Sequence, residues 1–136
     1  MRLASDRGGA VAVEFAMLAP ILLLILAGVV DYGRYLMQSL QMAGALRAAV
    51  QAGIDSAELD LASVKRVAAD QLASLNAIVE AATEETCPEG SSLTQGSCSG
   101  YGKPQLFLTV TANAPFRAAF LPSLGSLSGQ ATARLR

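Results

Sequence analysis

The hydrophobic pattern changes abruptly about ten residues into the chain. A short charged leader ends at Gly8-Gly9, and an apolar run follows from Ala10 to Val30, with Glu14 as its one acidic residue. At about 1.5 Å per residue, this run would span about 31 Å as a helix, close to the hydrocarbon thickness of a bilayer, about 30 Å. The pattern therefore predicts a helix that crosses a membrane.

Helical spacing continues beyond the apolar run. Apolar residues recur at three- and four-residue steps as far as Val50, and Gly53 followed by Asp55-Ser56 indicates the end of the helix. We predict one rod over residues 11–52. A modest kink is expected at Pro20, because proline cannot donate a hydrogen bond to the carbonyl four residues earlier.

A second amphipathic helix is predicted over residues 56–80. Asp55 and Glu58 have the spacing of a capping box, with Asp in place of Ser or Thr. Packing against the first helix is favoured over a binding groove for its apolar stripe. The stripe, at three- and four-residue spacing, consists of Leu61, Val64, Val67, Ala68, Leu72, Leu75 and Val79.

The C-terminal part has strand patterns. Residues 82–104 are rich in Gly, Ser, Thr and Pro and predict a long exposed loop. Residues 105–113 alternate with period two and predict a strand that Pro115 ends, and residues 128–136 predict its partner. The expected fold is α+β: the long helix, membrane-spanning in its first half, the second helix, and a small antiparallel hairpin or sheet packed on the outer half of the long helix.

The N-terminal residues resemble the class-III prepilin signal, with Gly9 at the cut, Ala10 as the first mature residue, Glu14 at mature position five and then an apolar helix. More broadly, the chain is similar to the TadE-like family of minor pseudopilins of the tight-adherence (Tad/Flp) pilus. The segments that resemble the family are Gly9 to Ala16, Pro20, Asp31 to Arg34, Ala43 to Ala49, and Val110 to Arg117 with its Pro-Phe-Arg motif.

This resemblance implies a structural protein processed by a prepilin peptidase at the bacterial inner membrane. Residues 1–9 would be a cytoplasmic leader, 10–30 a single transmembrane helix, and 31–136 a periplasmic region. Arg2 and Arg7 favour this orientation by the positive-inside rule, although basic residues after the run weaken it. The implied partners are the membrane, the peptidase, other pseudopilins or pilins, and inner-membrane pilus-assembly proteins.

Two alternatives stay open. One is an uncleaved, membrane-anchored periplasmic adaptor or binding module, and the other is a secreted domain released by an ordinary signal peptidase. The second is disfavoured because no clean A-x-A site ends the run, which is longer than a usual signal-peptide core of about 7–15 residues. The mature N-terminus distinguishes the three interpretations. It would be Ala10 for the pseudopilin, Met1 for the uncleaved adaptor and a residue near Gly28 for the secreted domain.

Glu14 is the sharpest functional candidate. If Ala10 becomes the new N-terminus, its ammonium would be buried when helices form a bundle, and Glu14 of a neighbouring chain would neutralise it. The simpler interpretation is that Glu14 extends to the lipid headgroups. Ala12 and Ala16, four residues apart, would permit close helix approach. Tyr32 and Tyr35 follow the run, where their rings favour the membrane interface.

Cys87 and Cys98 are the only cysteines. In an oxidising compartment they predict one disulfide across the Gly- and Ser-rich loop. Their spacing does not suit a CxxC redox pair or a zinc knuckle.

Composition excludes most catalytic chemistry. The chain has no His, and therefore no Ser-His or Cys-His nucleophile pair and no imidazole metal ligand. The acidic run of Glu84, Glu85 and Glu89 lacks calcium-ligand spacing and is interpreted as solvated. A formal net charge of −1 gives no footprint for nucleic acid. We expect no enzyme, catalytic residue, metal, cofactor or small-molecule substrate.

Overall fold

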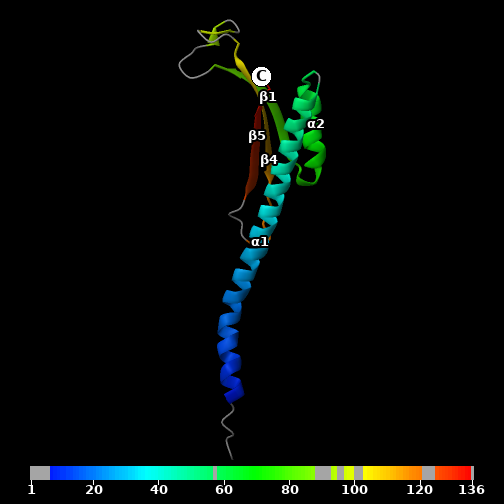
Figure 1. Ribbon diagram of the computed structural model, residues 1–136. Helices are drawn as coiled ribbons and strands as arrows, with labels where there is room; N and C mark the ends of the chain where they lie inside the picture. The colour runs from blue at the N-terminus through cyan, green and yellow to red at the C-terminus, as the bar shows by residue number, and fades with distance from the viewer. Residues whose placement is uncertain are drawn as a thin grey trace, which may run out of the picture.

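The structure, a computed structural model, describes residues 7–56, 58–87, 93–94, 97–99, 103–120 and 125–135. Its axis is the helix α1 (Arg7–Asp55), whose N-terminal half extends away from the rest of the molecule (Figure 1). Its 49 residues correspond to about 74 Å at about 1.5 Å per residue. The predicted rod is confirmed and is continuous through Pro20; the kink stays a prediction.

The second helix is shorter than predicted. Helix α2 spans Leu61–Gln71, and Asp60 caps it by accepting hydrogen bonds from the backbone N–H groups of Ala62 at 2.9 Å and Ser63 at 3.2 Å. The predicted capping box on Asp55 and Glu58 is therefore wrong, since Asp55 is the last residue of α1. A short 3₁₀ turn, η1 (Ala73–Leu75), follows and ends at Asn76 in the left-handed conformation, with φ of 50°.

A strand follows where the end of a helix and the start of a loop were predicted. Strand β1 (Ile78–Thr86) pairs antiparallel with β4 (Gln105–Pro115), and Ile78 lies opposite Asn113. Predicting a helix to residue 80 and a loop from residue 82 was wrong for this segment. The segment Ala81-Ala82-Thr83-Glu84-Glu85 has little strand propensity of its own; β4 supplies its hydrogen bonds, which shows how strongly such propensity depends on context.

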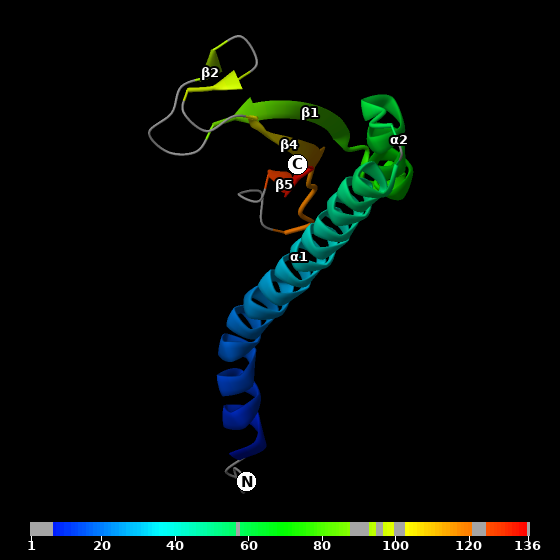
Figure 2. The same cartoon turned by 45° about the horizontal axis from the view of Figure 1, so that its top comes forward.

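The predicted C-terminal strands are both present. Strand β4 covers the predicted residues 105–113, and β5 (Ser126–Arg134) begins two residues before its predicted start. The three long strands form an antiparallel sheet of order β1–β4–β5. Two short strands, β2 (Leu93–Thr94) and β3 (Ser97–Cys98), pair with each other beyond its end (Figure 2). The remainder of the predicted loop lies partly outside the described residues.

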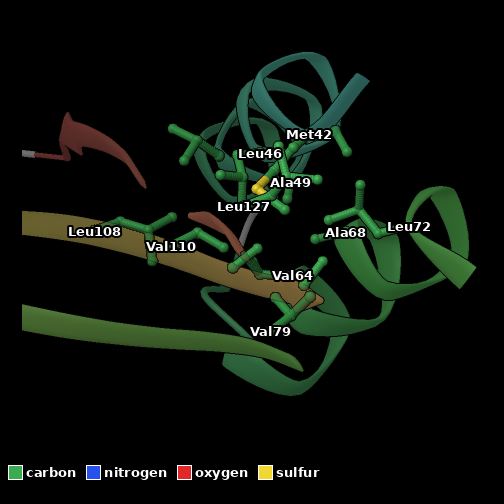
Figure 3. Close-up of a cluster of buried hydrophobic side chains, with 14 of the residues drawn as sticks. Met42, Leu46, Ala49, Val64, Ala68, Leu72, Val79, Leu108, Val110 and Leu127 are labelled. Atoms are coloured by element: carbon green, nitrogen blue, oxygen red, sulfur yellow. The ribbon is translucent and has the colours of Figure 1, made fainter. Parts of the chain in front are cut away.

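The core lies between one face of the sheet and the C-terminal half of α1, with α2 beside both (Figure 3). Burial alternates along β4, as the period-two pattern predicted. Helix α2 contributes Val64 and Ala68, and its C-cap residue contributes Leu72; all three are members of the predicted stripe. The other buried core residues come from α1, the strands and the segment after β4: Met42, Ala45, Leu46, Ala49, Val50, Val79, Leu108, Val110, Ala112, Ala114, Phe116 and Leu127. We call this unit, residues 31–135, the head domain.

Candidate functional site

The apolar half of α1, residues 11–30, has no buried residue in the structure and is mostly exposed. Its large side chains are exposed, including Leu24 at 74%. Among the described residues, α1 is the one helix that is long and apolar enough to cross a membrane, judged by length and composition. A continuous apolar surface of this size does not persist in water on an isolated soluble domain. This half of α1 suggests a single-pass membrane anchor.

The predicted processing residues lie at the start of this helix. The Gly9–Ala10 peptide is in the first turns of α1, which begins at Arg7. Backbone N–H groups in a first turn have no intrahelical acceptor, so opening the helix here breaks few hydrogen bonds. Gly9 is exposed, and a Cβ added there would meet nothing within 4 Å.

The residues proposed for helix pairing do not form one cluster. Ala12 and Ala16 share a face of α1, because residues four apart are neighbours on a helix. Glu14 is two residues from each and therefore lies on nearly the opposite face. All three are exposed. A helix that packs on Ala12 and Ala16 would differ from the one that meets Glu14.

At the end of the apolar run, Asp31 connects α1 to the segment after β4. Its side chain is fully buried, and its two carboxylate oxygens accept hydrogen bonds from the backbone N–H groups of Ala119 at 2.9 Å and Phe120 at 2.7 Å. Arg34 Nη1 lies 4.0 Å from Asp31 Oδ1. A carboxylate that accepts N–H groups makes stronger hydrogen bonds than a neutral acceptor. Asp31 thus joins α1 to residues that lie 88 and 89 positions further along the chain.

One turn further along α1, an aromatic pair adds to this contact. The rings of Tyr35 and Phe116 meet edge to face, with centroids 5.3 Å apart and planes at 86°. Tyr32 is exposed, as an interfacial ring would be, but Tyr35 is half-buried against the head domain. The interfacial position of both rings stays a prediction, and Tyr35 in addition packs against Phe116. We call the contact between residues 31–35 and 115–120 the junction.

The junction was missed by the sequence reasoning, although both of its segments had been noted. The resemblance to the TadE-like family includes both segments, Asp31-Tyr32-Gly33-Arg34 and Pro115-Phe116-Arg117, but it assigns no role to their residues. An acid placed directly after Val30, at the end of the apolar run, was the available signal. Its partners are backbone N–H groups, which sequence patterns do not reveal.

The predicted disulfide is present. Cys87, directly after β1, is bonded to Cys98 in β3, with their Cα atoms 5.6 Å apart. The bond ties the short β2–β3 hairpin to the end of β1. Glu84 and Glu85 of the acidic run are exposed on β1, and Glu89 lies outside the described residues. Within the described ranges, no group of three or more His, Cys, Asp or Glu side chains is placed to hold a metal ion.

Comparison with curated proteins and with solved structures finds no match. A family model does match: its description is TadE-like protein, and it covers residues 9–51. The matched segment contains Gly9, Glu14, the whole apolar half of α1 and Asp31. This match confirms the resemblance to the TadE-like family, which implies a component associated with the Tad pilus.

Proposed function

We propose that this chain is a minor pseudopilin-like structural component of Tad/Flp pilus assembly that a prepilin peptidase cleaves between Gly9 and Ala10. The observation that supports this most is the start of α1, where Gly9 and Glu14 precede an exposed apolar helix inside the segment that matches the family. The same helix continues into the head domain, as a rod that links a membrane to a folded unit would. The chain would act at the inner membrane as a structural part, with the peptidase as the enzyme.

The proposed topology has residues 1–9 in the cytoplasm, 10–30 in the membrane and 31–136 in the periplasm. The Cys87–Cys98 disulfide supports a head domain in an oxidising compartment, because cytosolic thiols are kept reduced. Proposed partners are the peptidase, other pseudopilins or pilins, and inner-membrane assembly proteins.

Cleavage gives Glu14 its role in this proposal. A new ammonium at Ala10 would be costly to bury among helices, and a Glu14 carboxylate from a neighbouring chain would offset that cost. Glu14 is exposed in the single chain and is therefore available to a neighbour. Ala12 and Ala16, on nearly the opposite face, would allow a different helix to approach closely.

The first experiment determines the mature N-terminus by mass spectrometry after co-expression with the cognate peptidase. We expect a chain that begins at Ala10. Gly9→Leu should retain residues 1–9, because a large side chain obstructs a protease cleft that accepts glycine, whereas Gly44→Leu, at an open helix position, should be cleaved normally. A native protein that still begins at Met1 would favour the uncleaved adaptor, and one that begins near Gly28 a secreted domain.

The second experiment isolates Glu14. Glu14→Leu should insert into membranes at least as well as the native chain, because a carboxylate is removed from the apolar run. It should be cleaved and yet impair piliation. If the Glu14→Leu protein is inserted and cleaved and still supports normal piliation, the pairing role is refuted. Glu14 would then only extend to the lipid headgroups.

A further inference from the structure

Two hollows lie beside the junction, one polar and one apolar. The polar pocket, of about 400 Å³, is lined by Arg34, Gln38, Ser74, Leu75, Asn76, Pro115 and Arg117. The apolar groove, of about 670 Å³, is lined by Pro20, Leu23, Leu24, Leu26, Ala27, Val30 and Phe120. Neither hollow has a role in the function proposed above.

The two hollows follow one face of α1. Ala27, Val30, Arg34 and Gln38 succeed each other at three- and four-residue steps, which places them in one row along the helix. The end of β4 and the segment after it border both hollows, with Pro115 and Arg117 at the pocket and Phe120 at the groove. The polar pocket and the apolar groove therefore lie one after the other along the same face of α1.

The boundary between them coincides with the end of the apolar run. The groove extends along α1 from Pro20 to Val30, about 15 Å at about 1.5 Å per residue, and the pocket begins at Arg34, one turn later. One leaflet contributes about half of the bilayer's hydrocarbon thickness, or about 15 Å. With residues 10–30 in a membrane, the groove spans one leaflet and the pocket lies at the headgroups.

The charge of the pocket suits a phosphate. Its lining contains two arginines and no acid. The side chain of Arg34 is half exposed, and Arg117 is exposed. The carboxylate of Asp31 is 4.0 Å from Arg34 Nη1 and also accepts the two N–H groups of residues 119 and 120. Arginine presents a planar fork of N–H donors that matches phosphate oxygens.

We propose that the junction binds a membrane phospholipid, with the phosphate between Arg34 and Arg117 and an acyl chain in the groove beside Phe120. This proposal depends on the membrane anchoring proposed above. The bound lipid would set the height of the head domain above the bilayer, since it contacts both α1 and the segment after β4. An anionic phospholipid is favoured, because two cations face its headgroup.

Lipid retention tests the headgroup contact. The full chain is purified in detergent, dioleoylphosphatidylglycerol is added, and bound lipid is counted by native mass spectrometry. Arg34→Gln combined with Arg117→Gln should weaken retention roughly tenfold to thirtyfold. Arg47→Gln, which removes an exposed arginine about 20 Å further along α1, should retain lipid like the native chain.

Equal losses in the Arg47→Gln control, or full retention by the double variant, would overturn the proposal. Inorganic phosphate, added at the lipid's concentration, should not displace the lipid, because it has no acyl chain for the groove. Displacement by inorganic phosphate would instead assign the pocket to free phosphate.

Fluorescence tests the groove. The chain has no Trp, so Phe120→Trp introduces a single indole beside the apolar half of α1. In nanodiscs with acyl chains brominated at mid-depth, this indole should be quenched, and Ile78→Trp, at an exposed position on β1, should not. A protein that remains in the nanodisc without quenching at position 120 refutes the lipid site alone. A protein that never enters the nanodisc refutes the membrane anchoring.

Discussion

The two halves of α1 belong to one continuous helix, yet they bury their side chains differently. Leu24, in the N-terminal half, is 74% exposed, whereas Leu46, in the C-terminal half, is 1% exposed. The N-terminal half is apolar around its circumference except at Glu14. The C-terminal half confines its buried residues to one stripe, from Met42 through Leu46 and Ala49 to Val50, and leaves Gln41, Arg47 and Gln51 exposed. An apolar circumference suits lipid and an apolar stripe suits a protein core, so one helix is built for two surroundings.

The most direct test of this comparison removes the same side chain from each half. Leu46→Ala should lower the free energy of unfolding of the head domain by about 2–5 kcal/mol, because the cavity opens in a packed core. Leu24→Ala, at a position outside the core and 74% exposed, should leave that free energy unchanged. Thermal unfolding in detergent micelles, followed by circular dichroism, measures both. Equal losses would mean that the two halves do not differ in the way described.

The next test cuts the connection where the halves meet. Asp31→Ala should cost about 1.5–3 kcal/mol for each charge-assisted hydrogen bond lost, and Asp31→Asn, which keeps one acceptor oxygen, should cost less. Hydrogen exchange at the amides of Ala119 and Phe120 should accelerate in both variants. Asp55→Ala, at the exposed end of α1, is the control and should change stability by less than about 0.5 kcal/mol. Unchanged exchange in Asp31→Ala would show that other contacts hold the junction.

Removing the disulfide tests whether the stability of the head domain is coupled to the membrane anchoring by the N-terminal half of α1. In the chain-entropy model, replacing Cys87 and Cys98 by Ser removes about 2.5–3 kcal/mol of stabilisation, given a sequence separation of 11. Reduction of the native protein should lower its melting temperature similarly. Extraction from membranes should not change, because the bond lies in the head domain. Altered extraction would indicate coupling between the two regions.

The smallest effects come from two glycines of α1. A Cβ at Gly53 would lie 2.6 Å from Leu108 Cδ2 and 3.1 Å from Val64 Cγ2, so Gly53→Ala should destabilise the head domain by about 1–3 kcal/mol. Gly44 has open space, and Gly44→Ala should stabilise the helix by about 0.5–1 kcal/mol. Melting temperatures should therefore move in opposite directions. A shift of the same sign in both would contradict the close packing at Gly53.

The candidate site was only partly accessible to sequence reasoning. Gly9, Ala10 and Glu14 were identified by a local motif, and their proposed roles depend on a peptidase and on neighbouring chains. The Cys87–Cys98 bond followed from two cysteines and a compartment. The junction depends on hydrogen bonds from the backbone N–H groups of residues 119 and 120 to Asp31. The hydrophobic periodicity of the sequence does not predict this contact.

The sequence by itself determined the elements whose signals are local: the long helix, its apolar half, the alternating strand β4 and the tail strand β5. Hydrophobic period and length suffice for these, since each acts within one segment. Only the tertiary structure decided that residues 78–86 form a strand, that Asp60 rather than Asp55 caps the second helix, and that Asp31 connects α1 to the segment after β4. Strand β1 and the junction depend on partners far along the chain. The contacts that stabilise them therefore form only once the chain has folded.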